Sequence, residues 1–176
     1  MQSLKKELAS RLKGAGRVAV LGVGSELRGD DIAGILVAKL VERSAKRNRR
    51  NTRYAIRNTK ARVVLRAFDG STAPENLTGE IRAFKPTHII IVDTADIAEA
   101  PGTVLLLKAG EVGRGISFST HKIPLKILID YFAHSLKCEI IIIGIQPKSI
   151  SFGKPVSKAV IASSRSVAAS ILEALS

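Results

Sequence analysis

Two consecutive aspartates, Asp30 and Asp31, end a glycine-rich segment, GVGSELRGDD, that follows a short apolar run. Glycines between a strand and a helix commonly make room for a phosphate. Here Leu27 occupies the third glycine position of the dinucleotide-binding fingerprint, and the chain contains no Gly-Lys-Ser/Thr loop. The N-terminus of a helix attracts negative charge, which the two carboxylates already supply. The segment therefore favours a cation rather than a phosphate.

The two aspartates are expected to have different roles. Asp30 is predicted to cap the following helix, whereas Asp31 is predicted to project toward a ligand. Asp93, which follows an apolar run, and His121, which precedes a predicted helix, would complete a set of two carboxylates and one imidazole. Such a set suits nickel, zinc, manganese or iron(II). Three alternatives remain: Asp93 as a helix or turn cap, His121 as a turn residue, or Asp31 and Asp93 as a carboxylate dyad.

The elements that would position these residues alternate between strands and helices. Apolar runs predict strands over 17–24, 62–69, 88–95, 103–108 and 139–146. Helical spacing and capping signals predict helices over 2–13, 31–45, 73–84, 122–136 and 157–176. This alternation indicates an α/β fold, a single domain with a mainly parallel five-stranded sheet and helices on both faces. In such sheets ligands bind outside the carboxyl ends of the strands, where the candidate residues fall.

The charge of the chain is unevenly distributed. The net charge is +13, and residues 43–62 hold nine basic and no acidic residues, so most of the excess lies in this segment. The segment contains one aromatic residue and no recognisable nucleic-acid-binding motif, so it is interpreted as a solvated helix end and loop. A docking surface for an acidic protein or for RNA is the alternative, although nucleic acid is not the favoured partner.

Composition excludes several other classes of protein. The longest apolar stretches are far below the roughly 20 residues that span a bilayer, so we expect no membrane insertion and a cytoplasmic protein. The single cysteine, Cys138, excludes an internal disulfide and any multi-cysteine metal site within this chain. We expect Cys138 to be an inert, partly buried thiol.

Six ordered blocks carry a resemblance to a known family. They are LGVGSELRGDDIAG, FDGSTAPEN, IIIVDTAD, APGTV, STHKIPL and IIIGIQP. Their order and approximate spacing resemble those of the nickel–iron hydrogenase maturation endopeptidases, over roughly residues 17–175. The resemblance implies a compact α/β enzyme that removes a short C-terminal extension from the hydrogenase large-subunit precursor once nickel has been inserted.

The resemblance also implies which residues form the site. Asp31 corresponds to the second acidic residue of the DD block. Asp93 corresponds to the aspartate after the third strand, and His121 to the histidine of the THxxP block. They are the implied catalytic and metal-binding residues. Nickel is expected to be supplied by the precursor, and another divalent ion is expected to be able to substitute. The sequence departs from the family at Ser25, where asparagine is common, and at Ile32, where glycine is frequent.

The implied organisation is a single maturation endopeptidase domain over 1–176. Residues 1–14 are interpreted as an N-terminal helical extension, and 43–62 as a basic insertion. The alternative function is a non-catalytic, nickel-sensing module that docks on the hydrogenase precursor without cutting it.

Overall fold

Strands and helices alternate along a computed structural model that describes residues 2–48, 63–112, 117–118 and 125–176. The strands are β1 (Arg17–Val23), β2 (Val64–Ser71), β3 (His88–Asp96), β4 (Val104–Lys108), β5 (Ser117–Phe118) and β6 (Glu139–Ile145). The α-helices are α1 (Gln2–Arg11), α2 (Ala33–Asn48), α3 (Thr78–Phe84), α4 (Leu125–Ser135) and α5 (Lys158–Ala174). Short 3-10 helices are η1 (Gly29–Ile32), η3 (Pro74–Leu77) and η4 (Ala109–Glu111). Every predicted strand and helix is present, the predicted helix over 73–84 being divided between η3 and α3.

The sheet has the strand order β2-β1-β3-β6-β4. Strands β1, β2, β3 and β6 pair in parallel, whereas β4 pairs antiparallel with β6. The two-residue β5 pairs antiparallel with the end of β3, outside this order. The prediction of a mainly parallel five-stranded sheet is therefore confirmed, and β5 is a short addition that the sequence did not indicate.

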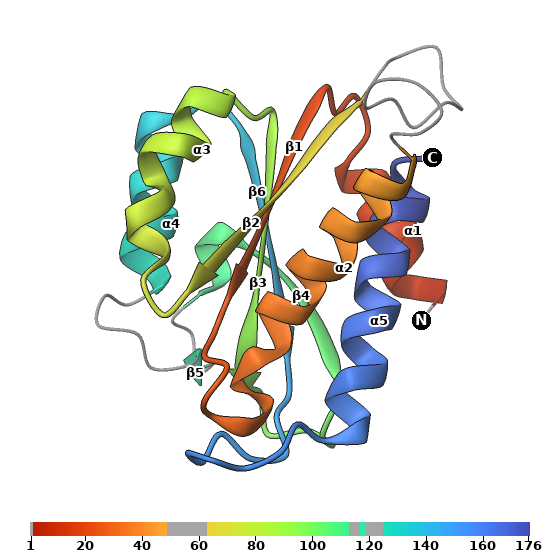
Figure 1. The fold of residues 1–176 in the computed structure, drawn as a ribbon. Helices are drawn as coiled ribbons and strands as arrows, with labels where there is room; N and C mark the ends of the chain where they lie inside the picture. The colour runs from red at the N-terminus through yellow and green to blue at the C-terminus, as the bar shows by residue number, and fades with distance from the viewer. Residues whose placement is uncertain (1, 49–62, 113–116, 119–124) are drawn as a thin grey trace.

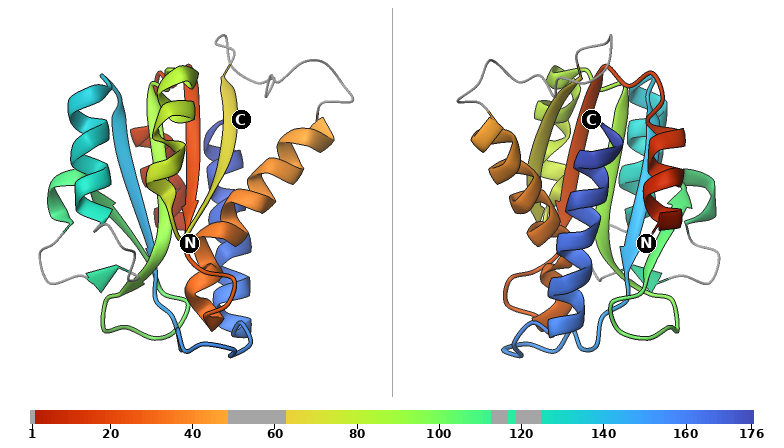
Figure 2. Two further views of the ribbon diagram at one scale, coloured as in Figure 1. Left: turned by 60° about the vertical axis from the view of Figure 1, so that its left-hand side comes forward. Right: turned by 90° about the vertical axis from the view of Figure 1, so that its right-hand side faces the viewer.

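Helices cover both faces of the sheet. Helices α1, α2 and α5 lie on one face, and α3 and α4 lie on the other (Figures 1 and 2). Residues 89–92 of β3 are fully buried, with Ile90 packed toward the first group of helices and Ile91 toward the second. A strand covered on both faces needs apolar residues at successive positions, which explains its continuous apolar run.

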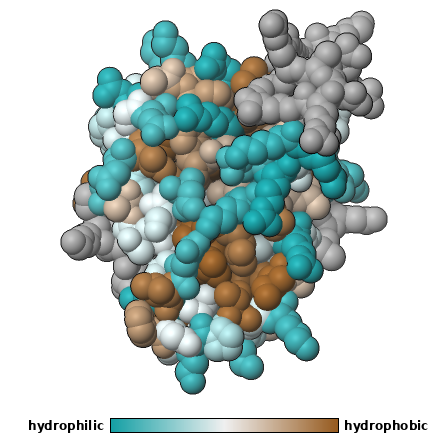
Figure 3. Space-filling view, viewed as in Figure 1, coloured by the Kyte–Doolittle hydropathy of each residue, from teal (hydrophilic) through white to brown (hydrophobic). Residues whose placement is uncertain are grey.

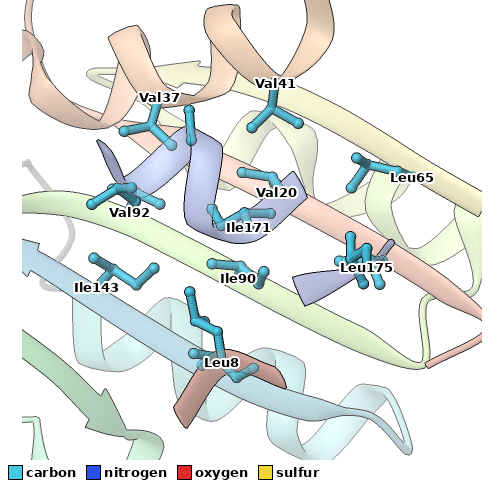
Figure 4. Packing of buried hydrophobic residues seen from close by; sticks show 14 of the residues in the cluster. Leu8, Val20, Val37, Val41, Leu65, Ile90, Val92, Ile143, Ile171 and Leu175 are labelled. Atoms are coloured by element: carbon cyan, nitrogen blue, oxygen red, sulfur yellow. The ribbon is translucent and has the colours of Figure 1, made fainter. Parts of the chain in front are cut away.

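The larger hydrophobic cluster joins α1, α2 and α5 to the sheet. Figure 4 shows Leu8 of α1 beside Ile90 and Ile143, while Val37 and Val41 approach the same layer from α2. Because Leu8 is fully buried, the predicted N-terminal helix belongs to the core of the domain.

Side-chain hydrogen bonds fasten α1 to the end of the sheet where the parallel strands begin, here called the amino edge. The Arg11 guanidinium donates to Glu139 Oε1 at 3.1 Å, to the Leu107 carbonyl at 3.0 Å and to the Ile140 carbonyl at 3.4 Å. These contacts bridge β4 and β6 on the side away from the candidate residues.

Part of the predicted basic insertion lies outside the described residues. Residues 43–48 form the C-terminal end of α2, and residues 49–62 are not described. Within the described ranges, no helix is long and apolar enough to cross a membrane.

Candidate active site

The site is built at the carboxyl edge, the end of the sheet where the parallel strands finish. Strand β1 ends at Val23 and leads through a turn into η1, which carries Asp30 and Asp31. The neighbouring strand β3 carries Asp93, which pairs with Gly144 of β6. Two of the three predicted site residues thus come from the ends of adjacent central strands. The third, His121, lies outside the described residues.

Three glycines allow η1 and α2 to begin directly against the sheet. A Cβ atom on Gly34 would lie 2.1 Å from the Val92 carbonyl oxygen and 2.4 Å from that of Val23. One on Gly22 would lie 2.2 Å from the Gly34 oxygen, and one on Gly24 would lie 1.8 Å from the Asp31 oxygen. Gly24 also adopts a φ of +146°, which favours glycine. The glycine-rich segment therefore provides close backbone packing where a phosphate loop would leave a gap.

Asp31 and Asp93 are both buried, with 4% and 0% of their surfaces exposed. The backbone N–H of Thr94 donates to Asp93 Oδ1 at 2.7 Å, and the Thr94 hydroxyl donates to the Asp30 carbonyl oxygen at 3.1 Å. This second bond and the close approach of Gly34 to Val92 place residues 30–34 in direct contact with the end of β3. The structure thus gathers two acidic residues, 62 positions apart in sequence, at one edge.

The predicted cap role of Asp30 is wrong. No side chain caps η1, and the Asp30 carboxylate instead accepts hydrogen bonds from the loop between β6 and α5. Oδ1 accepts from the Ser157 N–H at 2.6 Å, while Oδ2 accepts from the N–H groups of Lys148 at 2.7 Å and Ser149 at 3.4 Å. Its partners lie more than 100 residues away, so local sequence could not reveal them. Asp30 therefore fixes a distant loop beside the site.

Asp69, near the end of the neighbouring strand β2, is exposed at the surface. Its Oδ1 accepts a hydrogen bond from the Ser71 N–H at 3.1 Å, and its Oδ2 lies 3.6 Å from Lys39 Nζ. Lys39 also forms a hydrogen-bonded ion pair with Glu26, which raises the pKa of Lys39. Asp69, Lys39 and Glu26 thus form a charged group on the surface.

Gln146 is a residue whose role the sequence did not indicate. Its side-chain oxygen accepts hydrogen bonds from the N–H groups of Ile97 at 2.7 Å and Glu99 at 3.4 Å. Its amide nitrogen donates to Asp96 Oδ1 at 3.4 Å. Gln146 thus holds the loop that leaves β3 at the carboxyl edge.

His88, His134 and Cys138 lie away from this edge. His88 enters β3 at the amino edge, with its Nδ1 3.0 Å from Thr87 Oγ1, and His134 is exposed on α4. Cys138 precedes β6, where burial raises its pKa to about 11. A thiol with this pKa stays protonated at neutral pH, which agrees with the predicted inert role.

A cavity of about 330 Å³ lies between α2, β2 and α3, with Glu42, Val64, Arg66 and Phe84 among its lining residues. Neither Asp31 nor Asp93 lines it. The candidate residues therefore lie outside this cavity, at the carboxyl edge of the sheet.

The described residues alone do not form a complete metal site. Among them, no group of three or more His, Cys, Asp and Glu side chains could hold a metal ion. Asp31 and Asp93 supply two carboxylates, a donor type that divalent transition metals accept together with imidazole. The two carboxylates therefore fit a metal site that is completed by ligands outside the described residues.

The fold and the buried carboxylates at its carboxyl edge define an α/β protein with an acidic candidate site. Comparison with known proteins makes this assignment specific. The family model HycI, hydrogenase maturation protease, matches residues 50–174. The chain belongs to the hydrogenase maturation protease family and is a peptide hydrolase.

Individual relatives agree with the family model. A Methanocaldococcus jannaschii protein named as a hydrogenase maturation protease is 36% identical over 149 residues, covering 85% of this chain and 83% of its own. The hydrogenase 3 maturation protease of Escherichia coli K12 is 32% identical over 139 residues, and the match covers 79% of this chain and 78% of the relative. The NiFe hydrogenase maturation protease HycI of Thermococcus kodakarensis superposes with a TM-score of 0.75 at 26% identity, covering 96% and 98% of the two chains.

Proposed function

We propose that this enzyme removes the C-terminal extension of a hydrogenase large-subunit precursor, and that nickel already held by the precursor is what it recognises. The observation that carries the proposal is the pair of buried carboxylates, Asp31 and Asp93, on contacting segments of a chain from this family. A hydrogenase large subunit is the substrate that the family implies. The family assignment favours this activity over a non-catalytic docking module.

Burial makes the two carboxylates suited to a cation. Removing each of the two carboxylates from water costs free energy. A divalent ion offsets both costs because it attracts the two groups and accepts their oxygens as ligands. His121, a site residue predicted from the sequence alone, would supply an imidazole donor to the same ion.

Nickel recognition would restrict cleavage to loaded precursor through differential affinity. A precursor without nickel presents no metal ion to the two carboxylates and the imidazole, and we therefore expect it to bind weakly. A precursor with nickel is held by the same ion that its own ligands hold. The peptide next to that ion is then fixed at the carboxyl edge. We expect cleavage of the precursor to take place in the cytoplasm.

The test is cleavage of purified precursor in nickel-loaded and nickel-free forms, measured as the mass lost from its C-terminus. We expect the wild-type enzyme to cleave only the loaded form. Asp93→Asn keeps the shape of the side chain but removes its charge, and we expect kcat/KM to fall by about 100-fold or more. Equal cleavage of both forms would exclude nickel recognition, and no mass loss from either would exclude the proposed substrate.

The matched control is Asp96→Asn, which makes the same change three residues further along β3. Asp96 is exposed and contacts the Ala98 N–H and Gln146 rather than the buried carboxylates. We expect this variant to cleave loaded precursor within about twofold of wild type. If Asp96→Asn were as impaired as Asp93→Asn, charge at this edge in general would matter, and the assignment of Asp93 would be wrong.

A further inference from the structure

Two large apolar side chains are exposed beside the candidate site. Leu27, in the turn before η1, is 65% exposed, and Phe152, in the loop between β6 and α5, is 77% exposed. Among the described residues, the other exposed large apolar side chains are Ile127 and Tyr131 of α4, which are 57% and 38% exposed. Leu27 and Phe152 come from segments 125 positions apart in sequence, and both lie at the carboxyl edge.

The two segments that carry this pair are joined by backbone contacts. The Gly153 N–H donates to the Leu27 carbonyl at 2.9 Å, and the Asp30 N–H donates to the Ser149 carbonyl at 3.0 Å. Arg28 Nε donates to the Ile150 carbonyl at 3.1 Å. Figure 1 shows the loop after β6 running along the bottom of the molecule, below the turn that leads into α2.

These contacts hold the loops in place before a partner arrives. The carboxylate of Asp30 adds three further hydrogen bonds between η1 and the same loop. A surface that is already ordered loses less conformational entropy on binding. We call this structure the Leu27–Phe152 surface, which consists of these two residues and the lysines Lys148 and Lys154.

The charge of the surface is one-sided. Lys148 and Lys154 are exposed on the same loop as Phe152, and the chain has no acidic residue between Glu139 and Glu173. Glu26, the acidic neighbour of Leu27, is paired with Lys39. The surface therefore offers apolar side chains with positive charge around them.

We propose that the Leu27–Phe152 surface docks the hydrogenase large-subunit precursor, through a segment that presents an apolar side chain flanked by carboxylates. The proposal rests on the proposed function, because the precursor must reach this edge to meet Asp31 and Asp93. In Figure 3 the largest apolar area of that face lies in its lower half, over the first part of α2 and toward the same edge. Aromatic and aliphatic anchors with complementary charge are typical of protein-binding surfaces.

The first test is steady-state cleavage of nickel-loaded precursor by a Leu27→Ala/Phe152→Ala variant. We expect KM to rise about tenfold or more, with kcat changed less than about twofold, because the lost contacts form when substrate binds. Ile127→Ala is the matched control, since it removes a similarly exposed apolar side chain from α4 on the other face of the sheet. We expect its KM to match wild type. Circular dichroism melting verifies that all variants are folded.

The second test reverses the charge of the surface. We expect a Lys148→Glu/Lys154→Glu variant to raise KM at low salt and to approach wild type at high salt, because ions screen the contact. Lys137→Glu, at the amino edge, is the control and is expected to leave KM unchanged. A rise in KM that salt does not reduce would contradict an acidic partner segment.

The outcomes separate docking from the proposed function. If wild type cleaves the loaded precursor and the Leu27→Ala/Phe152→Ala variant has the same KM, the docking proposal fails while the proposed function stands. If wild type does not cleave the precursor, the proposed function itself fails. The other possible occupant is a second copy of this chain, which sedimentation of the wild type and the variant tests. If the wild type self-associates while the variant is monomeric with an unchanged KM, the surface is assigned to self-association.

Discussion

Asp30 and Asp31 are adjacent in sequence but serve different parts of the molecule. Asp31 is buried at the candidate site, whereas the Asp30 carboxylate accepts three backbone N–H groups from residues 148–157. Bonds from N–H groups to an ionised carboxylate are stronger than those to neutral acceptors. Asp30 is therefore a structural anchor for the loop that carries Phe152.

This anchor predicts a large loss of stability when it is removed. Asp30→Ala leaves three partly buried N–H groups without their acceptor, and we expect the free energy of unfolding to fall by about 1–3 kcal/mol in urea titrations. The control is Asp130→Ala, which removes an exposed carboxylate paired with Lys126 and should cost less than about 0.5 kcal/mol. Equal effects for the two variants would show that the Asp30 hydrogen bonds add no net stability.

At the scale of elements, the start of α2 is determined by glycines that permit contact with two strands. Gly34 lies between the backbones of β1 and β3, where a Cβ would meet carbonyl oxygens at 2.1 and 2.4 Å. Backbone atoms in the middle of a sheet cannot move aside cheaply, since their hydrogen bonds would be lost.

Gly34→Ala is therefore expected to destabilise the fold by about 3 kcal/mol or more, or to prevent folding. Gly79→Ala is the matched control, because no atom lies within 4 Å of its added Cβ and the residue is in α3. Alanine favours a helix over glycine, so this control should gain about 0.5–1 kcal/mol. Thermal melts of both variants give the comparison, and a neutral Gly34→Ala would contradict the close approach.

The sequence predicted the elements well because each carries a local signal. Continuous apolar runs such as residues 89–92 identified the buried strands, and helical spacing identified the helices. The two-residue β5 is too short for such a signal. The antiparallel direction of β4 was also missed, although residues 97–103 are too few for the crossover that a parallel strand requires.

The site was predictable only in part. The positions of Asp31 and Asp93 followed from the rule that ligands bind at the carboxyl ends of parallel strands. The long-range partners of Asp30 and Gln146 have no local signal, since they depend on loops that meet only in the folded chain. The predicted metal-binding role of His121 stays a prediction.

At the scale of the whole molecule, the two edges of the sheet have different chemistry. The carboxyl edge holds the buried residues Asp30, Asp31 and Asp93, and the amino edge holds His88 near Glu139. Burial lowers the pKa of His88 from its ordinary value of 6.5, and Glu139 opposes this shift in part. The unfolded chain therefore takes up a proton at His88 at a higher pH than the folded chain does.

This difference predicts that His88 makes the protein less stable in acid. As pH falls below about 6.5, the unfolded state binds more protons than the folded state at this position, so the free energy of unfolding falls. We expect His88→Gln to reduce the stability difference between about pH 7.5 and about pH 5.5 in urea titrations. An unchanged or steeper dependence in the variant would contradict the lowered pKa.

The half-buried Cys138, with its pKa of about 11, gives the protein one naturally silent thiol. Thiol-directed reagents react with the thiolate, so they attack this residue slowly at neutral pH. A cysteine introduced at an exposed position such as Phe152 would then be labelled selectively, without first replacing the native residue. Fluorescence from that single dye would report in real time when a precursor arrives at and leaves the carboxyl edge.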